Sequence, residues 1–287
     1  MKGILNLYKP KGMSSAAAVG KARRILGVKT AGHFGTLDPA GEGVLLIGVG
    51  RAARLFDFFL KGEKRYEAVF TFGYQTDTLD GEGAVVKVSE IIPTAVDIGD
   101  ALRSFVGNNM QLPPAYSAKS LNGVRAYTLA RRGEEIELKP AAVQIFDAQL
   151  LGYNSPAARV LIRCSSGTYI RSICRDVAEK LNSAATMTAI KRVASGAFKV
   201  ENSISFKELE AKKGVMLIPL EYVLKDLPQV CLDGSFKKRL DNGVRISVLD
   251  TEMTLPKSDF TLYADGELYG IAHIIDGKIA IKTLLKD

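Results

Sequence analysis

The stretch Thr30-Ala-Gly-His-Phe-Gly-Thr-Leu-Asp-Pro-Ala-Gly-Glu-Gly-Val-Leu-Leu-Ile-Gly48 concentrates unusual residues in a short length of chain. It holds five glycines, one of the two histidines and an Asp38-Pro39 step, and an apolar strand follows at once. Glycine allows backbone conformations that other residues avoid, and proline pushes the residue before it toward extended geometry. We therefore predict a stiff loop that holds Asp38 outside any helix, near His33, and that is the first place to expect chemistry.

Hydrophobic spacing predicts strands and helices on both sides of this loop. Every second residue from Tyr66 to Phe72 is apolar, which predicts a strand with one buried face. Apolar residues at i, i+3, i+4, i+7 and i+11 from Ile170 to Leu181 predict an amphipathic helix. The other expected elements are strands at residues 4–8, 44–49, 84–88 (partner of the strand from Tyr66), 143–151 and 158–164, and helices at residues 15–27, 51–60, 94–106 and 125–132.

The order of these elements predicts the fold class and a domain boundary. Strands outnumber helices and often follow one another with turn signals between them, which favours an α+β fold with a largely antiparallel sheet. Beyond Leu227-Pro228 the sequence changes to short strands separated by glycine turns such as Asp265-Gly266 and Asp276-Gly277. We therefore expect a main domain over residues 1–225 and a small, mainly-β domain over residues 226–287.

Composition restricts the compartment and the chemistry. No apolar run approaches the roughly 20 residues that span a membrane, and the N-terminus lacks the pattern of a signal peptide. Three widely spaced cysteines (Cys164, Cys174 and Cys231) argue against a disulfide framework, and two histidines without a Cys-x-x-Cys pair argue against zinc. We expect a cytoplasmic, metal-free protein that does not interact with membranes.

The net charge is +8 and the sequence pI is about 9.3. Lysine and arginine contact phosphates without selecting a sequence, so this charge is compatible with nucleic-acid binding, although solvated surface charge gives the same total. A basic segment with interleaved tyrosine after Pro113-Pro114 suits a phosphate backbone, and a solvated helix is its alternative interpretation. The candidate RNA-backbone contacts in this segment are Lys119, Arg125, Arg131 and Arg132.

Taken one at a time, the candidate site residues each have an ordinary structural interpretation. Asp38 is also a common turn residue, and His33 is a general base, an RNA contact or a loop hydrogen-bonder. Tyr66 is either a core aromatic or a stacking platform at the sheet edge. Arg171 and Arg175 lie one helical turn apart, so a bound anion, a buried carboxylate or simple exposure must relieve their repulsion.

Taken together and in order, six motifs cover roughly residues 3–225. They are Lys9-Pro10-x-Gly12-x-Ser14-Ser15, Gly32-His33-x-Gly35-Thr36-Leu37-Asp38-Pro39 leading into Gly43-Val44-Leu45, Lys64-Arg65-Tyr66, Gln75-Thr76-Asp77-Thr78-x-Asp80, Pro113-Pro114-Ala115-Tyr116-Ser117-Ala118 and Gly167-Thr168-Tyr169-Ile170-Arg171. In this combination the sequence resembles the TruB family, the tRNA pseudouridine-55 synthases.

The resemblance implies the pseudouridine synthase fold, an α+β core with a mixed, largely antiparallel sheet, followed by a PUA-like C-terminal domain. It also implies an RNA-binding insertion at about residues 108–140. The implied reaction is the isomerisation of one uridine in the T-loop of tRNA, position 55, to pseudouridine by base flipping and without a cofactor. The implied partner is tRNA, bound by a monomer that has no obligate protein partner.

The resemblance also implies roles for individual residues. Asp38 is the essential carboxylate, the nucleophile of the reaction, and Arg171 is its ion-pair partner. Tyr66 packs on the target base, Tyr169 borders the same pocket, and His33 belongs to the loop that receives displaced nucleotides.

The sequence departs from the family pattern near this site. Ile190-Lys191-Arg192 stands in the place of Leu-Arg-Arg, so Ile190 is the residue expected to touch the base through its backbone. Phe34 is bulkier than usual and Gly41 replaces a common alanine, which predicts altered loop flexibility. Two alternatives stay open, a guide-RNA-dependent pseudouridine synthase and a tRNA-binding folding chaperone without catalysis.

Overall fold

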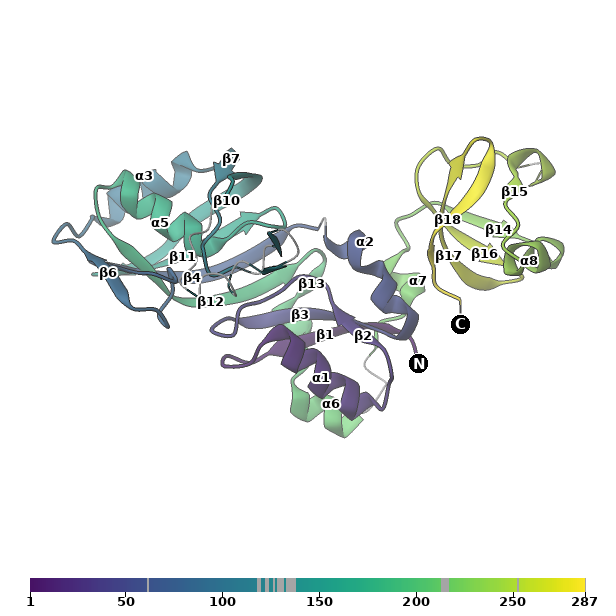
Figure 1. Cartoon of the computed structure of the whole chain (residues 1–287), viewed down its shortest axis with the longest axis horizontal. Coiled ribbons are helices and arrows are strands. Elements are labelled where there is room, and N and C mark those ends of the chain that lie inside the picture. The colour runs from purple at the N-terminus through teal and green to yellow at the C-terminus, as the bar shows by residue number, and fades with distance from the viewer. Residues whose placement is uncertain are drawn as a thin grey trace.

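The computed structural model describes residues 1–60, 62–117, 138–212, 217–251 and 253–286, together with residues 120, 121, 124, 125, 127 and 132. Two sheets dominate the molecule (Figure 1). The larger sheet is built from strands between residues 3 and 199, and the smaller one from strands between residues 229 and 284.

The larger sheet has nine strands and the order β1-β3-β12-β4-β11-β10-β7, with β2 paired to β3 and β13 paired to β12. Every pairing is antiparallel except that of β12 with β3. The prediction of an α+β fold with a mixed, largely antiparallel sheet is therefore confirmed. The bounds are β1 (Gly3–Lys9), β2 (Ala31–His33), β3 (Glu42–Val49), β4 (Lys64–Phe72), β7 (Gly107–Gln111), β10 (Ala141–Asn154), β11 (Ala157–Cys164), β12 (Ala185–Ser195) and β13 (Phe198–Lys199).

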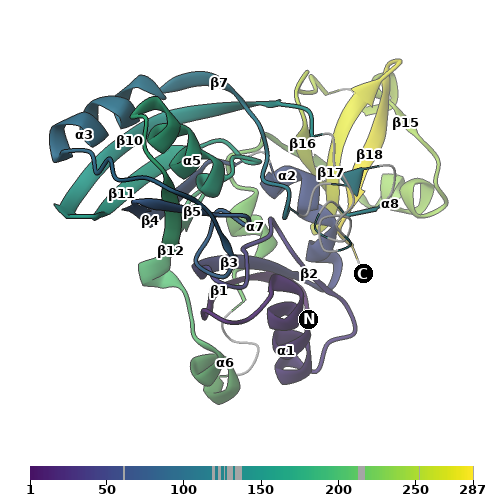
Figure 2. The ribbon, with the colours of Figure 1, turned by 60° about the vertical axis from the view of Figure 1, so that its left-hand side comes forward.

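Helices cover different parts of this sheet (Figures 1 and 2). The helices α3 (Ala95–Ser104) and α5 (Ile170–Lys180) share one core with β4, β10, β11 and β12, whereas α1 (Ser15–Leu26) and α6 (Phe206–Lys212) pack on β1 and β3. Local sequence sets the ends of α1, because Ser14 accepts a hydrogen bond from the Ala17 N–H and Gly27 adopts a left-handed conformation.

The smaller sheet has the order β14-β16-β17-β18-β15 and a core of its own. Leu268, Ile271 and Leu285 also pack in a cluster with Leu46 and Leu55 of the N-terminal part, on the face of β1 and β3 that is opposite to α1. The elements are α7 (Leu220–Val223), β14 (Gln229–Leu232), α8 (Gly234–Asp241), β15 (Ile246–Ser247), η3 (Val248–Thr251), β16 (Phe260–Ala264), β17 (Glu267–Ile275) and β18 (Lys278–Leu284).

Several local predictions need correction. The strand near residues 84–88, β6 (Val85–Val88), pairs with β5 (Tyr74–Thr76) rather than with β4, because the chain bends at Gly73. The helix expected from residue 125 is wrong at its start, since β9 (Val124–Arg125) pairs with β8 (Ser120–Leu121). The helix expected at residues 51–60 is split into η1 (Gly50–Leu55), a 3-10 helix, and α2 (Phe56–Leu60).

Several elements of the structure have no counterpart among the predictions. The strand β12 was missed although it lies beside β4, because polar and small residues interrupt its apolar pattern. The helix α8 and the short 3-10 helix η2 (Val200–Asn202) were also missed. Among the described residues, none of the helices combines the length and the apolarity needed to cross a bilayer.

Candidate active site

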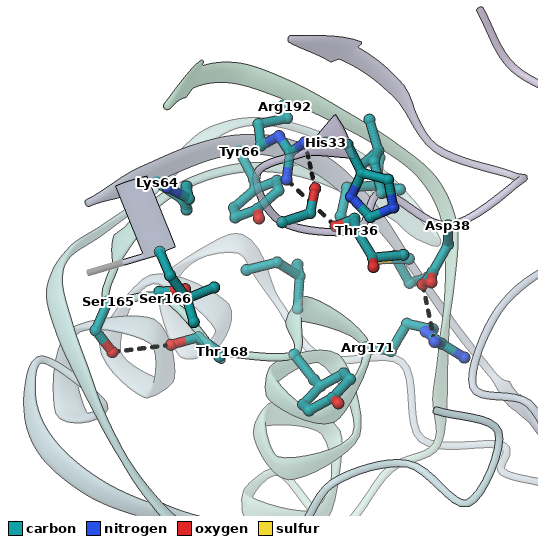
Figure 3. Close-up of a pocket in the computed structure, with 18 of the residues that line it drawn as sticks. His33, Thr36, Asp38, Lys64, Tyr66, Ser165, Ser166, Thr168, Arg171 and Arg192 are labelled. Atoms are coloured by element: carbon teal, nitrogen blue, oxygen red, sulfur yellow. Dashed lines mark hydrogen bonds and ion pairs between the residues drawn. The ribbon is translucent and has the colours of Figure 1, made fainter. Parts of the chain in front are cut away.

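A pocket of about 920 Å³ opens where β4 begins, between the loop that carries Asp38 and the turn before α5 (Figure 3). Asp38 and Arg171 lie together on one side of it, Lys64 and Ser166 lie on the opposite side, and Tyr66 stands between them. The Asp38 loop is therefore part of the wall of a cavity large enough for a nucleotide.

The segment that begins with Lys9-Pro10 holds the backbone on both sides of Asp38. The Ser15 hydroxyl donates to the carbonyl of Leu37 at 2.8 Å and accepts from the N–H of Leu37 at 2.9 Å. On the other side, the Gly12 N–H donates to the carbonyl of Pro39 at 2.8 Å. These bonds connect the first motif to the second and limit the movement of the Asp38 carboxylate.

Lys9 reinforces the same connection from a fully buried position. Its ammonium donates to the carbonyls of Met13 at 2.6 Å and Pro10 at 3.0 Å and lies 3.5 Å from that of Pro39. Burial lowers the pKa of Lys9 to about 8, and the nearby Asp38 carboxylate opposes that shift. Lys9 thus supports the loop through carbonyl groups and carries no direct contact with the pocket.

Arg192 supports the same loop from β12. Its side chain is 1% exposed, and it donates to the carbonyls of Val44 at 2.7 Å, Thr36 at 3.3 Å and Gly35 at 3.3 Å. A side chain at Gly43 would collide with the Arg192 backbone, and its φ of 105° is also one that glycine tolerates. Glycine at this position therefore permits the parallel pairing of β3 with β12.

Asp38 forms an ion pair with Arg171, with 2.8 Å between Oδ2 and Nη2. The Arg171 side chain is 5% exposed and that of Asp38 is 41% exposed, so the cation is fixed while the carboxylate stays accessible from the pocket. Arg171 Nη1 also lies 3.3 Å from Oδ2 of Asp80 and donates to the carbonyl of Thr78 at 3.0 Å, and Nη2 donates to that of Tyr116 at 3.1 Å. A planar guanidinium can satisfy all four oxygens at once.

Tyr66 belongs both to the core and to the pocket. It is 9% exposed, packs in the cluster under α5, and lines the cavity beside Arg192, its direct cross-strand partner. Burial raises the pKa of the Tyr66 phenol, and the Arg192 guanidinium opposes that shift. The core and platform interpretations of Tyr66 are therefore compatible.

A family model described as TruB family pseudouridylate synthase (N terminal domain) matches residues 23–170 of the chain, a range that includes Asp38 and Tyr66. The chain belongs to the TruB family. The predicted family membership is therefore confirmed.

Curated TruB-family relatives match over most of their length. A tRNA pseudouridine synthase B of Clostridium novyi (strain NT) is 40% identical over 247 residues, which cover 86% of each chain. One of Dehalococcoides mccartyi (strain CBDB1) is 41% identical and covers 86% of this chain and 85% of the relative. One of Alkaliphilus oremlandii (strain OhILAs) is 35% identical over 275 residues, 94% of this chain and 92% of the relative.

Solved structures show the same fold at low identity. The chain superposes on one in a Cbf5-Nop10-Gar1 complex with a TM-score of 0.72 and 21% identity, covering 99% of this chain and 85% of that one. A chain of an H/ACA RNP bound to a substrate RNA containing 2′-deoxyuridine gives a TM-score of 0.71 at 19% identity, with coverage of 99% and 85%. These matches confirm the predicted fold.

The TruB-family chain brings the other expected pocket residues to the same cavity. His33, Tyr169 and Ile190 all line it. Burial lowers the pKa of His33. Gln111 holds the backbone of Tyr169 through two hydrogen bonds, of 2.8 Å to its N–H and 3.1 Å to its carbonyl.

The departures from the TruB-family pattern have structural explanations. A Cβ atom at Gly41 would lie 2.9 Å from Cδ1 of Leu37 and 3.2 Å from Cγ2 of Ile190, so glycine leaves room for both of these side chains. Phe34 is 1% exposed and stacks on Phe59 with 4.5 Å between ring centroids. The larger ring therefore anchors the loop in the core.

Three further residues of the site were missed from sequence. Asp80 and Lys64 were given within motifs without a role, and Arg192 was noted only as a neighbour of Ile190. The position of Lys64, two residues before Tyr66 on the same face of the strand, was the one signal available.

The predicted RNA-backbone contacts fall largely outside what the structure describes. Lys119 and Arg131 lie outside the described residues, and only the backbone of Arg125 is described, in β9. Arg132 is exposed. The first residues of the insertion expected at about 108–140 belong to β7 in the main sheet.

Proposed function

We propose that this chain isomerises a uridine of tRNA, the one at position 55 in the T-loop, to pseudouridine with Asp38 as the nucleophile. The observation that carries the proposal is the ion pair of Asp38 with the buried Arg171 at the wall of a nucleotide-sized pocket. The curated relatives named tRNA pseudouridine synthase B support tRNA as the substrate.

The reaction breaks the bond between ribose C1′ and uracil N1 and joins C1′ to C5, so that C5 loses a proton and N1 gains one. A carboxylate can act as a nucleophile at such a glycosidic centre. The ion pair with the Arg171 guanidinium holds the Asp38 carboxylate at the wall of the pocket, where this role needs it. Attack on the sugar, attack on the base and elimination are all compatible with this position of the carboxylate.

A base inside a folded RNA loop must leave its stack before it can enter the pocket. Extrusion costs a few kcal/mol, part of which stacking on an aromatic ring offsets. Tyr66 supplies that ring in the proposal, Ile190 and Tyr169 border the base, and His33 meets the displaced nucleotides. The backbone contacts proposed along the insertion are those of Lys119, Arg125, Arg131 and Arg132.

Incubation of the purified chain with an unmodified tRNA transcript, without additives, tests the proposal. Pseudouridine should form at position 55 and at no other uridine. An isolated T-arm stem-loop should be modified as well, without any guide RNA. Dependence on a guide would assign the protein to the guide-dependent class, and tRNA binding without product would favour a folding chaperone. We also propose that the protein is monomeric and acts in the cytoplasm. Size-exclusion chromatography of the protein alone and with tRNA would check that it is a monomer.

A further inference from the structure

Lys64 is a buried cation of the pocket that the proposed chemistry does not use. Lys64 is 4% exposed and lines the cavity, and its ammonium donates to the carbonyl of Phe59 at 3.3 Å. Within the described part of the chain it forms no ion pair with a carboxylate. Burial lowers its pKa to about 8, and the nearby Arg192 guanidinium adds to that shift. A charge in such a position is costly unless an anion joins it.

The charges of the pocket are unequally compensated. Arg171 is neutralised by Asp38 and Asp80, at the side where the reaction is proposed. Among the described residues Arg192 hydrogen-bonds to three backbone carbonyls and to the Tyr66 phenol and forms no ion pair, so Arg192 and Lys64 are two buried cations without a carboxylate partner. The part of the pocket that Lys64 lines is therefore electropositive.

The turn before α5 faces Lys64 across this side of the cavity (Figure 3). It contains Ser165, Ser166 and Thr168, and the hydroxyl of Ser166 makes no hydrogen bond within the described residues. The Ser165 hydroxyl already accepts from the Gln144 N–H at 3.0 Å and shares a 3.3 Å bond with Thr168. The lysine thus has one hydroxyl free to join it in binding the same oxygen-rich group.

On the basis of the function proposed above, we propose that Lys64, assisted by Ser166, binds an RNA phosphate next to the extruded nucleotide. Lys64 and Tyr66 share one face of β4, and side chains two residues apart in a strand are separated by about 6–7 Å. A base that stacks on Tyr66 brings its flanking phosphates within that range. A phosphodiester also supplies the negative charge that the two buried cations lack, and lysine is a common point-charge ligand for phosphate.

A chemical double-mutant cycle on the T-arm stem-loop tests this site. The probes are the native stem-loop and two versions with a neutral methylphosphonate, either 5′ or 3′ to the target uridine. The proteins are wild type, Lys64→Met and Lys64→Arg, with Arg65→Met as a control that removes an equal charge from the exposed neighbouring position. Binding is measured for every pair, and product formation for the native stem-loop.

Lys64→Met should weaken binding of the native stem-loop by about 10- to 100-fold, the usual effect of losing a charged hydrogen bond. One methylphosphonate should weaken wild-type binding similarly and have little further effect on Lys64→Met. Lys64→Arg should retain most of the affinity, and Arg65→Met should lose only a few-fold.

Two outcomes would overturn the phosphate site. In one, neither methylphosphonate weakens binding to the wild-type protein, a result that does not depend on whether Lys64→Met folds. In the other, the effects of the methylphosphonate and Lys64→Met add in full. Absence of pseudouridine from the wild-type reaction would instead refute the proposed function, while the binding cycle would still report on Lys64.

Discussion

Nη2 of Arg171 lies 2.8 Å from Oδ2 of Asp38, and this contact joins the first turn of α5 to the loop between β2 and β3. The two partners differ in exposure, since the arginine is buried and the carboxylate is open to the pocket. Arg171 also reaches Asp80 at 3.3 Å, so it is held even when Asp38 changes its contacts. A fixed cation beside an accessible carboxylate is the arrangement that a reactive aspartate needs.

The substitution Asp38→Asn should abolish pseudouridine formation while tRNA affinity stays within a few-fold of wild type. Asparagine keeps the size of the side chain and removes the charge that the proposed nucleophile needs, whereas most of the RNA-binding surface is unchanged. Product mapping and a binding titration measure the two quantities. Turnover close to that of wild type would refute the role of Asp38.

The substitution Arg171→Met should lower the free energy of unfolding by about 3–5 kcal/mol, because it leaves Asp80 buried without its partner. Arg171→Lys should be more stable than Arg171→Met. Its kcat should still fall about 100-fold or more relative to wild type, because one ammonium cannot replace a guanidinium that contacts two carboxylates and two carbonyls. Urea unfolding and single-turnover rates measure these effects.

A matched control lies one turn along α5. Arg175 pairs with its neighbour Asp176, at 2.6 Å between Nη2 and Oδ1, and donates to the Leu112 carbonyl at 3.1 Å. Arg175→Met should cost about 1 kcal/mol or less and leave kcat near wild type. Equal effects at the two positions would contradict the special role of Arg171.

The substitution Tyr66→Phe separates the two functions of this ring. It should change the free energy of unfolding by about 1 kcal/mol or less and lower kcat at least about tenfold, because Tyr66 lines the pocket in which the target base is proposed to bind. Phe70→Leu, on the same face of β4 and deeper in the core, should instead lower stability and spare the rate of the folded enzyme. Parallel losses of stability and rate in Tyr66→Phe would indicate that Tyr66 contributes only to core packing.

The neighbouring serines 14 and 15 offer a test of the support under Asp38. Ser15→Ala removes both hydrogen bonds to Leu37 and should cost about 1–3 kcal/mol together with a clear loss of kcat. Ser14→Ala removes the N-cap of α1 and should cost about 1 kcal/mol without lowering kcat. Thermal melting and single-turnover assays would reveal the difference, and the same kcat for both variants would argue against positioning by Ser15.

RNA affinity should depend on pH through Lys64. Its pKa of about 8 in the free protein reflects burial and the facing Arg192 of β12, with only Cys164 of β11 opposing the shift. A bound phosphate raises that pKa, so binding takes up a proton above about pH 8 and affinity falls as the pH rises. Titrations between about pH 7 and pH 9 should show this fall in wild type. A fall of the same size in Lys64→Met or Lys64→Arg would assign the dependence to another group.

Local sequence patterns suffice to predict those helices, strands and loops that are specified by residues close together in the chain. Alternating burial along β4 follows from a period of two, and the ends of α1 follow from Ser14 and Gly27. The run from residue 30 to 48 likewise indicates a constrained loop, since glycine and proline restrict the backbone where they stand. The resemblance of ordered motifs then extends these local signals to a family.

Contacts between distant segments depend on chain packing, which no local period encodes. Spacing alone leaves Arg171 and Arg175 equivalent, yet packing buries the first between Asp38 and Asp80 and pairs the second with its neighbour. The same holds for β12, which shows no clear period but lies beside β4 and carries Arg192 under the Asp38 loop. The burial and partners of a charge, and hence its chemistry, are set by the strands and helices that meet around it.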